Sequence, residues 1–387
     1  MTHNSYDVMR AIDRTRASRT RFQYPQLMAR ALILCATCVH VAFAYTAYSE
    51  CDPTANGACT VGHPGGLQGK LRVAIAQLAS NSTTTLEENA AKHAAWVTMA
   101  AKEGARVVLF PELSMTGYFA ERVVTLAGTE GDAAAANQRL REAEDVVASA
   151  AGKHNVYAII GVPVFFANVS KNQTRPWYNT ALVISPNGKR LYRQAKLYPC
   201  CAVDGHAGSW LDVFNLTNFD GYVIPVATQV CFDDFHPEIV RLQAMAGAQV
   251  LFYMSWESDV SMEGKLSLGD KLASAQSVVN AHAAVNQLFV VQANAGALVD
   301  NMRTEWDAGY NGPAAGGSHG QSRVVDPNGI TLEEARIFGQ QLLIHDLDLS
   351  LLAPQRRRMV MGSKSHAVFG PMWDEGLKRF GRMPIEW

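Results

Sequence analysis

From residue 71 onward, short apolar segments typical of β-strands alternate with longer segments that carry small and apolar residues at helical spacing. Two Pro-Asn-Gly turns, within 180–193 and at 326–329, each predict a hairpin. Strands are predicted at 71–78, 105–110, 155–166, 222–230, 250–255 and 288–294, and helices at 86–103, 133–152, 236–247 and 268–286. Strand–helix alternation mixed with hairpins predicts layered α/β architecture with partly antiparallel sheets.

Composition supports a folded chain and excludes some partners. Hydrophobic residues make up 48% of the 387 positions and charged residues 18%, which excludes global disorder. The formal net charge of −1 gives no basic excess with which to neutralise phosphates, so we expect no nucleic-acid partner.

The N-terminal region differs from the rest of the chain. Residues 1–48 hold six Arg and two Asp, a net charge of +4, while 31–48 contains no Asp, Glu, Lys or Arg. A basic stretch followed by an apolar run and small residues is the layout of a secretory signal. We therefore predict a signal peptide or signal-anchor in 1–49, a linker in 50–70 and one domain in 71–387. The protein would enter the secretory pathway and be secreted or tethered to a membrane.

Features that suit an oxidising compartment follow this segment. Cys51 and Cys59 flank a turn-rich linker in which they can form a disulfide. Asn168 and Asn172 are the best glycosylation sites of the four N-x-[ST] sequons, because they lie in a polar stretch between predicted strands. The other two sequons are at Asn81 and Asn215.

Three apolar strands run directly into reactive side chains. Glu112 follows VVLF-Pro, Cys231 follows IPVATQV, and Lys196 ends the segment RLYRQAK. A thiol needs a base to supply thiolate at neutral pH, and a carboxylate with a raised pKa is such a base. A lysine and the backbone N–H after the nucleophile, here that of Phe232, can stabilise an oxyanion.

The strings around these residues resemble the nitrilase, or carbon–nitrogen hydrolase, superfamily. They are LFPELSMTGY (109–118), YNTALVISPNGK (178–189), CFDDFHPEIVRLQAMAGAQVLFYMSW (231–256), AAVNQLFVVQAN (283–294) and HGQSRVVDPNG (319–329). The resemblance implies a four-layer αββα sandwich and a Glu–Lys–Cys triad that attacks non-peptide amides, ureido groups or nitriles. The segment 231–238 is also similar to the vanin and biotinidase branch, whose members are secreted amidases.

The lysine departs from the pattern of the superfamily. The expected position, directly after Tyr-Arg, holds Gln194, and the next lysine is Lys196. Residues two apart on a strand share a face, so we predict Lys196 as the electrophilic partner. The alternative is that Gln194 occupies the slot as a neutral donor and activity is weak or absent.

The remaining predictions concern the pocket and the reaction. Tyr118 and Trp256 are predicted to line the pocket, and Glu257 to favour a substrate with a cationic or amine end. We expect no metal or cofactor, because metal-ligand spacings are absent from 71–387. The predicted reaction is hydrolysis of a small-molecule amide through a thioester. The alternatives are a nitrilase and a catalytically weak binding or scaffold protein. The resemblance also implies a homo-oligomer.

Mass spectrometry of the native protein tests the secretory prediction. We expect glycans on Asn168 and Asn172 and, in the cleaved form, an N-terminus beyond the apolar run. An intact Met1 together with the absence of any glycan would contradict it.

Overall fold

The structure is a computed structural model, and it describes residues 69–79, 84–118, 123, 133–166, 176–200, 202–257, 268–296, 318–352 and 371. The chain divides into two compact units, Met1–Pro64 and Gly65–Trp387, and every described residue belongs to the second. Several predictions fall outside the described residues: the signal or anchor segment, the Cys51–Cys59 pair, and the sequons at Asn81, Asn168 and Asn172.

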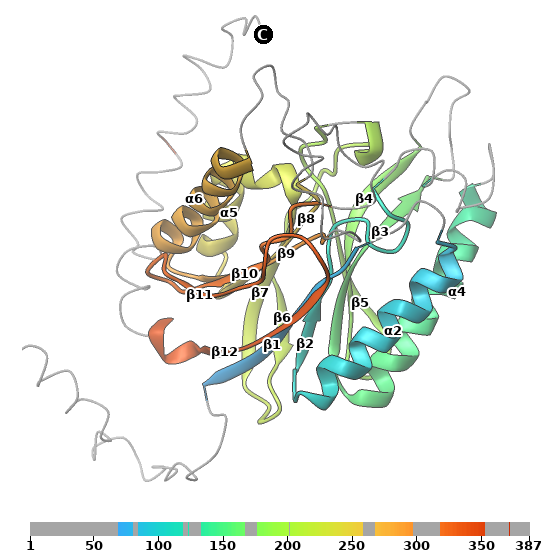
Figure 1. The fold of residues 1–387 in the computed structure, drawn as a ribbon, viewed down its shortest axis with the longest axis horizontal. Helices are drawn as coiled ribbons and strands as arrows, with labels where there is room; N and C mark the ends of the chain where they lie inside the picture. The colour runs from blue at the N-terminus through green and yellow to red at the C-terminus, as the bar shows by residue number, and fades with distance from the viewer. Residues whose placement is uncertain are drawn as a thin grey trace, which may run out of the picture. The chain divides into compact units, whose positions relative to one another are not determined.

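Two six-stranded sheets form the centre of the fold (Figure 1). The first sheet has a parallel centre, β1–β2–β3, and antiparallel neighbours on both sides. Its order is β12 (Gln341–Asp348), β1 (Lys70–Gln77), β2 (Val107–Leu109), β3 (Tyr157–Phe165), β4 (Trp177–Ile184) and β5 (Arg190–Ala195).

The second sheet is built in the same way, with β7, β8 and β9 parallel and the outer strands antiparallel. Its order is β11 (Thr331–Glu334), β10 (Arg323–Val325), β9 (Phe289–Asn294), β8 (Val250–Ser255), β7 (Val223–Val230) and β6 (Phe214–Thr217).

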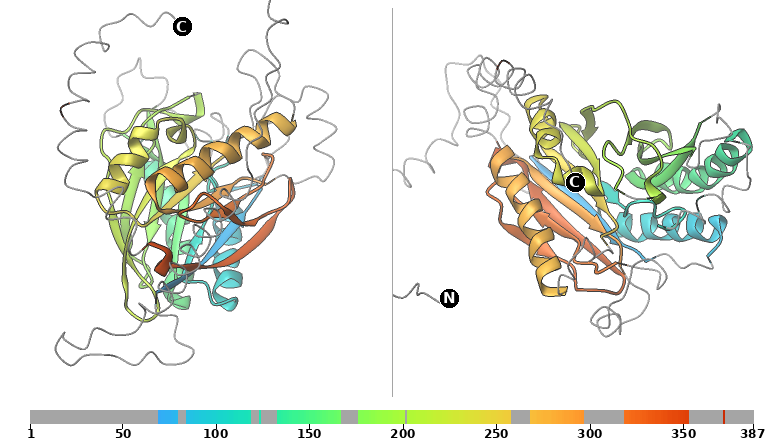
Figure 2. Two further views of the ribbon diagram at one scale, coloured as in Figure 1. Left: turned by 90° about the vertical axis from the view of Figure 1, so that its left-hand side faces the viewer. Right: turned by 90° about the horizontal axis from the view of Figure 1, so that it is seen from above.

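Helices cover the outer face of each sheet, α2 (Leu86–Lys102) and α4 (Ala133–His154) on the first, α5 (Pro237–Met245) and α6 (Leu268–Asn286) on the second (Figures 1 and 2). Side chains along each strand point alternately into the space between the two sheets and into the space between a sheet and its helices. Val73 packs between the two sheets whereas its neighbour Ala74 packs toward α2 and α4. The four-layer αββα sandwich is therefore confirmed.

The predicted strands and helices are present, with ends that differ by a few residues. Two strands, β6 and β12, were not predicted. β12 has a mixed pattern of burial and returns from the second sheet to pair with β1 along its whole length. Arg72 on β1 binds the Asp346 carboxylate of β12 through two nitrogens, at 2.6 and 2.8 Å. Such a distant pairing leaves no local signal in the sequence.

Candidate active site

Glu112 lies on a tight turn directly after β2. Its neighbour Leu113 has a positive φ of 45°, and the Met115 N–H donates to the Gly161 carbonyl of β3 over 3.0 Å. From the other side, Asn89 of α2 donates its side-chain amide to the Met115 carbonyl, also over 3.0 Å. The glutamate is thus held between the sheet and the helical layer, and it is fully buried.

Lys196 follows β5 and points its ammonium group at two carboxylates. Its Nζ lies 2.9 Å from Glu112 Oε1 and 2.8 Å from Asp204 Oδ2, and all three side chains are fully buried. Gln194, the alternative for this position, directs its amide elsewhere and donates to the carbonyls of Ala195 and Trp210. Of the two, the residue that reaches the carboxylates is Lys196.

Cys231 begins η2 (Cys231–Phe235), a short 3₁₀ turn at the end of β7. Its φ of 49° lies in the left-handed region, an uncommon conformation for a side chain other than glycine and one that is found at functional sites. The thiol and the Glu112 carboxyl group are close enough to affect each other's pKa, and Cys231 is 8% exposed. Two residues along, the Asp233 carboxylate accepts the backbone N–H groups of Leu197 and Tyr198, which ties the turn to the segment after Lys196.

The pKa values of these groups depend on burial and on one another. Burial raises the pKa of Glu112, Lys196 opposes this and Asp204 adds to it, and the result is about 7. Burial, followed by the Glu112 charge, raises the pKa of the Cys231 thiol well above its usual value, although Lys196 opposes them. Burial alone would lower the pKa of Lys196, but the nearby acidic groups of Cys231, Glu112, Asp204 and Cys200 outweigh this effect and raise it. The site thus contains a neutral thiol, a fixed cation and a carboxyl group that titrates near neutrality.

Two further residues of this cluster were not predicted, Asn179 and Asp204. The Asn179 side-chain amide on β4 donates to Glu112 Oε1 over 2.7 Å and to Asp204 Oδ1 over 3.2 Å. Lys196 lowers the pKa of Asp204 against the effect of burial, so this carboxylate is ionised. Asn179 lies inside the string YNT that supports the resemblance, but Asp204, in a short turn, gives no comparable signal.

The two predicted pocket aromatics lie beside this cluster. The rings of Tyr118 and Trp256 stack with centroids 5.7 Å apart, and the Trp256 backbone N–H donates to Glu112 Oε2 over 3.0 Å. The Tyr118 hydroxyl donates to Asp204 Oδ1 over 3.4 Å. The indole Nε1–H of Trp256 is buried and has no hydrogen-bond partner in the part of the chain that the structure describes.

Glu257 and Phe232 complete the set of predicted site residues. The Glu257 carboxylate is buried among Tyr253, Gln292 and His319, at 3.4, 3.1 and 3.7 Å. The Phe232 backbone N–H lies one peptide bond beyond Cys231 on the same turn. Their proposed roles in binding and oxyanion stabilisation stay predictions.

Two further side chains, His236 and Cys200, lie near this cluster. The His236 ring stacks on Tyr198 with centroids 3.4 Å apart, and His236 is the N-cap residue of α5. Cys200 is exposed, and its backbone N–H and thiol both contact Asp204 Oδ2, at 2.8 and 3.3 Å. This second thiol therefore borders the buried cluster.

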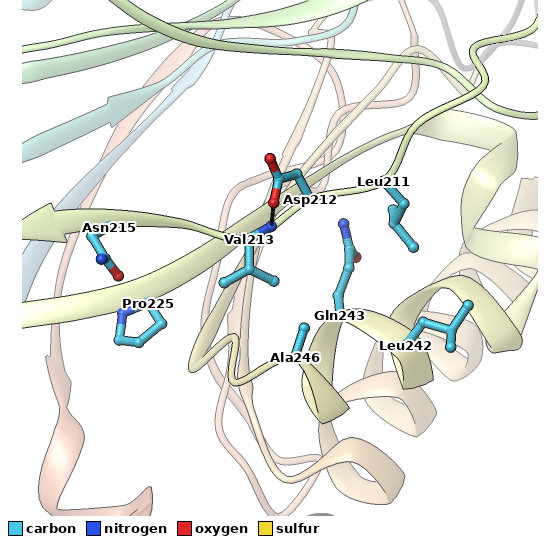
Figure 3. A pocket seen from close by; sticks show the side chains of 8 residues that line it. All are labelled: Leu211, Asp212, Val213, Asn215, Pro225, Leu242, Gln243 and Ala246. Carbon is cyan, nitrogen blue, oxygen red and sulfur yellow. Dashed lines mark hydrogen bonds between the residues drawn. The ribbon is translucent and has the colours of Figure 1, made fainter. Parts of the chain in front are cut away.

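A separate cavity of about 630 Å³ opens between α5 and the segment that leads into β6 (Figure 3). None of the buried residues around Glu112 lines it. Its lining consists of Leu211, Asp212, Val213, Asn215, Pro225, Leu242, Gln243 and Ala246. Asn215, a sequon residue, is exposed here.

Metal and membrane features were also sought within the described ranges. No group of three or more His, Cys, Asp or Glu side chains there is arranged to hold a metal ion. None of the described helices is long and apolar enough to cross a membrane.

A family model described as carbon-nitrogen hydrolase matches residues 72–357. The chain belongs to this family. It is 26% identical over 299 residues to a citrullinase of Francisella tularensis, covering 74% of this chain and 92% of that protein. It is 24% identical over 298 residues to an omega-amidase of Mus musculus, with the same two coverages of 74% and 92%. The family match identifies the chain as a carbon–nitrogen hydrolase.

Solved structures of this family share the fold. An amidase from Nesterenkonia sp. AN1 superimposes with a TM-score of 0.56 at 20% sequence identity, over 75% of this chain and 95% of that one. That structure carries the acetamide moiety of fluoroacetamide covalently added to its active-site cysteine. The same amidase has also been solved with butyramide, with a TM-score of 0.56 and 19% identity, over 75% of this chain and 97% of that one.

Gly161 provides a test of how the Glu112 turn is positioned. A Cβ atom at Gly161 would overlap backbone atoms of Pro111, Glu112 and Leu113. We expect Gly161→Ala to reduce stability by ~1–3 kcal/mol through overpacking. Because a displacement of ~1 Å in an active site costs ~10²-fold, kcat for a small amide should fall roughly 10- to 100-fold. Thermal unfolding and steady-state kinetics measure the two effects.

Gly152→Ala on α4 is the matched control. Its Cβ would lie 3.3 Å from the Gly188 nitrogen, a tight contact away from the Glu112 turn. We expect this variant to change stability without changing kcat. Wild-type kcat in a folded Gly161→Ala protein would contradict the positioning role of Gly161.

Proposed function

We propose that this enzyme hydrolyses the amide bond of a small molecule through a thioester on Cys231, with Glu112 and Lys196 as its partners. The observation that carries the proposal is the buried contact network among the three. Lys196 Nζ lies 2.9 Å from Glu112 Oε1, and the Cys231 thiol interacts electrostatically with the same carboxyl group. Nucleophile, base and cation are therefore close together in a buried site.

In the first half of the reaction, Glu112 takes the proton of the Cys231 thiol as the sulfur attacks the amide carbon. The raised pKa of the thiol means that no thiolate is stored beforehand, so proton transfer accompanies attack. Lys196 and the Phe232 backbone N–H stabilise the oxyanion of the tetrahedral intermediate. Glu112 then gives its proton to the departing nitrogen, the carbon–nitrogen bond breaks, and the thioester remains.

In the second half, Glu112 takes a proton from water, and the resulting hydroxide attacks the thioester carbon. The carbon–sulfur bond breaks and the proton returns to Cys231, which releases the acid and restores the thiol. A carboxyl group with a pKa of about 7 suits both the base and the acid steps at neutral pH.

Several observations support a small amide as the substrate. The relatives include an omega-amidase and a 2-oxoglutaramate amidase of Bacillus subtilis, the latter 29% identical over 237 residues, 59% of this chain and 73% of that protein. Trp256 and Tyr118 form an aromatic wall beside Glu112, and the Trp256 Nε1–H is a donor for a polar atom of the substrate. In this scheme Glu257 favours an amine end. A nitrile would use the same triad, and turnover assays with both compound classes distinguish them.

The cellular setting stays a prediction. Entry into the secretory pathway and a membrane tether depend on 1–49, which the structure does not describe. A homo-oligomer is supported by exposed Leu242 on α5 and Val285 on α6, and sedimentation velocity tests it.

The lysine assignment predicts different outcomes for two neighbouring variants. Lys196→Ala should lower kcat by ~10²–10³-fold, because a donor to the oxyanion is lost. Gln194→Ala, the control, should lower kcat far less, since the Gln194 amide contacts backbone carbonyls instead of Glu112. Steady-state kinetics, with acyl-enzyme mass on Cys231, provide the measurements. Unchanged kcat in Lys196→Ala would remove lysine from the mechanism.

The pH dependence tests Glu112 as the base. Since its carboxyl group must be ionised to accept the thiol proton, kcat/KM should rise through an acid limb near pH 7. The Asp204 charge raises the pKa of Glu112, so Asp204→Asn should move this limb to lower pH. Asp346→Asn changes a remote ion-paired aspartate and should leave the limb in place. A limb that moves in neither variant would contradict the coupling between Asp204 and Glu112.

A further inference from the structure

The turn η2, which begins with Cys231, is anchored to other parts of the fold through two consecutive aspartates, Asp233 and Asp234. Asp233 accepts the Leu197 and Tyr198 backbone N–H groups and so connects η2 to the lysine segment. Asp234, the next residue, faces the other way, toward α6. Both side chains are buried, at 1% and 4% exposure, so each needs a polar partner inside the protein.

One partner of Asp234 is His282, in the C-terminal half of α6. A single ring nitrogen, Nε2, lies 2.7 Å from the Asp234 backbone carbonyl and 3.1 Å from its carboxylate oxygen Oδ1. Because a carbonyl oxygen only accepts, Nε2 is the donor. One imidazole therefore fixes the main chain and the side chain of the same residue, three positions after Cys231.

His282 is itself held in place. It is 4% exposed, and its own backbone carbonyl accepts the side-chain amide of Asn286 over 3.1 Å. Burial disfavours the imidazolium form, but the Asp234 carboxylate outweighs this and raises the pKa of His282. A side chain of α6, in the outer helical layer, thus contacts the turn that carries Cys231.

We infer that His282 is a positioning residue for catalysis, acting through Asp234 to set the orientation of the Cys231 sulfur and the Phe232 N–H. The inference rests on the proposed role of Cys231 as nucleophile. His282 contacts neither of these atoms directly; it constrains the η2 backbone on which both are carried. Cys231 has a positive φ, and a strained conformation of this kind persists only where surrounding contacts enforce it. The contacts of His282 with Asp234 are among those that can do so.

Removal of the imidazole should therefore affect chemistry more than binding. In His282→Leu the Asp234 carbonyl and carboxylate lose their shared buried donor, and the turn relaxes away from its catalytic geometry. We expect kcat to fall roughly 10- to 100-fold with KM nearly unchanged, because misplacement of ~1 Å costs ~10²-fold. His282→Gln retains a side-chain N–H donor and should restore most of kcat.

Alkylation of Cys231 by iodoacetamide provides a second readout that needs no amide substrate. The rate at fixed pH should differ from wild type in His282→Leu and return toward it in His282→Gln, because it reports the placement of the thiol against Glu112. Absence of amide turnover in the wild-type protein would overturn the proposed function, whereas the alkylation rates would still test the positioning of the thiol.

Asn280→Ala on the same helix is the matched control for a purely structural effect. Asn280 is a partly buried polar residue of α6, and its side-chain amide group exchanges hydrogen bonds with the Thr331 hydroxyl of β11, which three strands separate from β7. We expect this variant to lower the melting temperature without changing kcat or the alkylation rate. A folded His282→Leu protein with wild-type kcat and wild-type alkylation would overturn the inference.

Discussion

The candidate active site depends on one buried cation, the ammonium group of Lys196. Lys196 lies within 3 Å of two carboxylates, Glu112 and Asp204, and all three side chains are fully buried. Two acids so close together cannot both ionise without a compensating charge. The ammonium group supplies that charge, and the Asn179 amide adds a hydrogen bond to each acid. Without Lys196 the cluster would hold unpaired buried carboxyl groups, so we regard its structural and chemical roles as inseparable.

The sandwich brings these groups together because the strands that carry them end at the same edge. Glu112 follows β2 and Lys196 follows β5, both in one sheet, whereas Cys231 and Trp256 follow β7 and β8 of the other. Each residue lies on a short turn that begins where the rigid hydrogen-bonded ladder stops. Close contacts then cross between the sheets, such as the Trp256 N–H to Glu112 bond at 3.0 Å. Such contacts fix the position of one sheet relative to the other beside Glu112.

The sequence indicated most of this arrangement, for a physical reason. Glu112 and Cys231 each follow an apolar strand. This pattern is local, so it can be recognised in the sequence without knowledge of the tertiary contacts. Asp204 and β12 differ in this respect, because their roles depend on contacts with distant parts of the chain. Asp204 forms an ion pair with Lys196, and β12 pairs with β1. The choice between Gln194 and Lys196 was open for a similar reason. Strand alternation places both side chains on one face, and only the end of β5 frees the second to reach Glu112.

The electrostatics also explain why such a site would depend on supporting residues. A thiol whose pKa is raised does not attack as a preformed anion, so its reactivity requires sulfur, carboxylate and substrate carbon to be aligned at the moment the proton moves. A cysteine with a depressed pKa would tolerate looser geometry, because its charge exists before the substrate arrives. In the proposed mechanism, alignment takes the place of prior ionisation. Two features of the turn maintain this alignment. Cys231 adopts a positive φ, and the buried residues Asp233 and Asp234 each accept a hydrogen bond from another part of the fold.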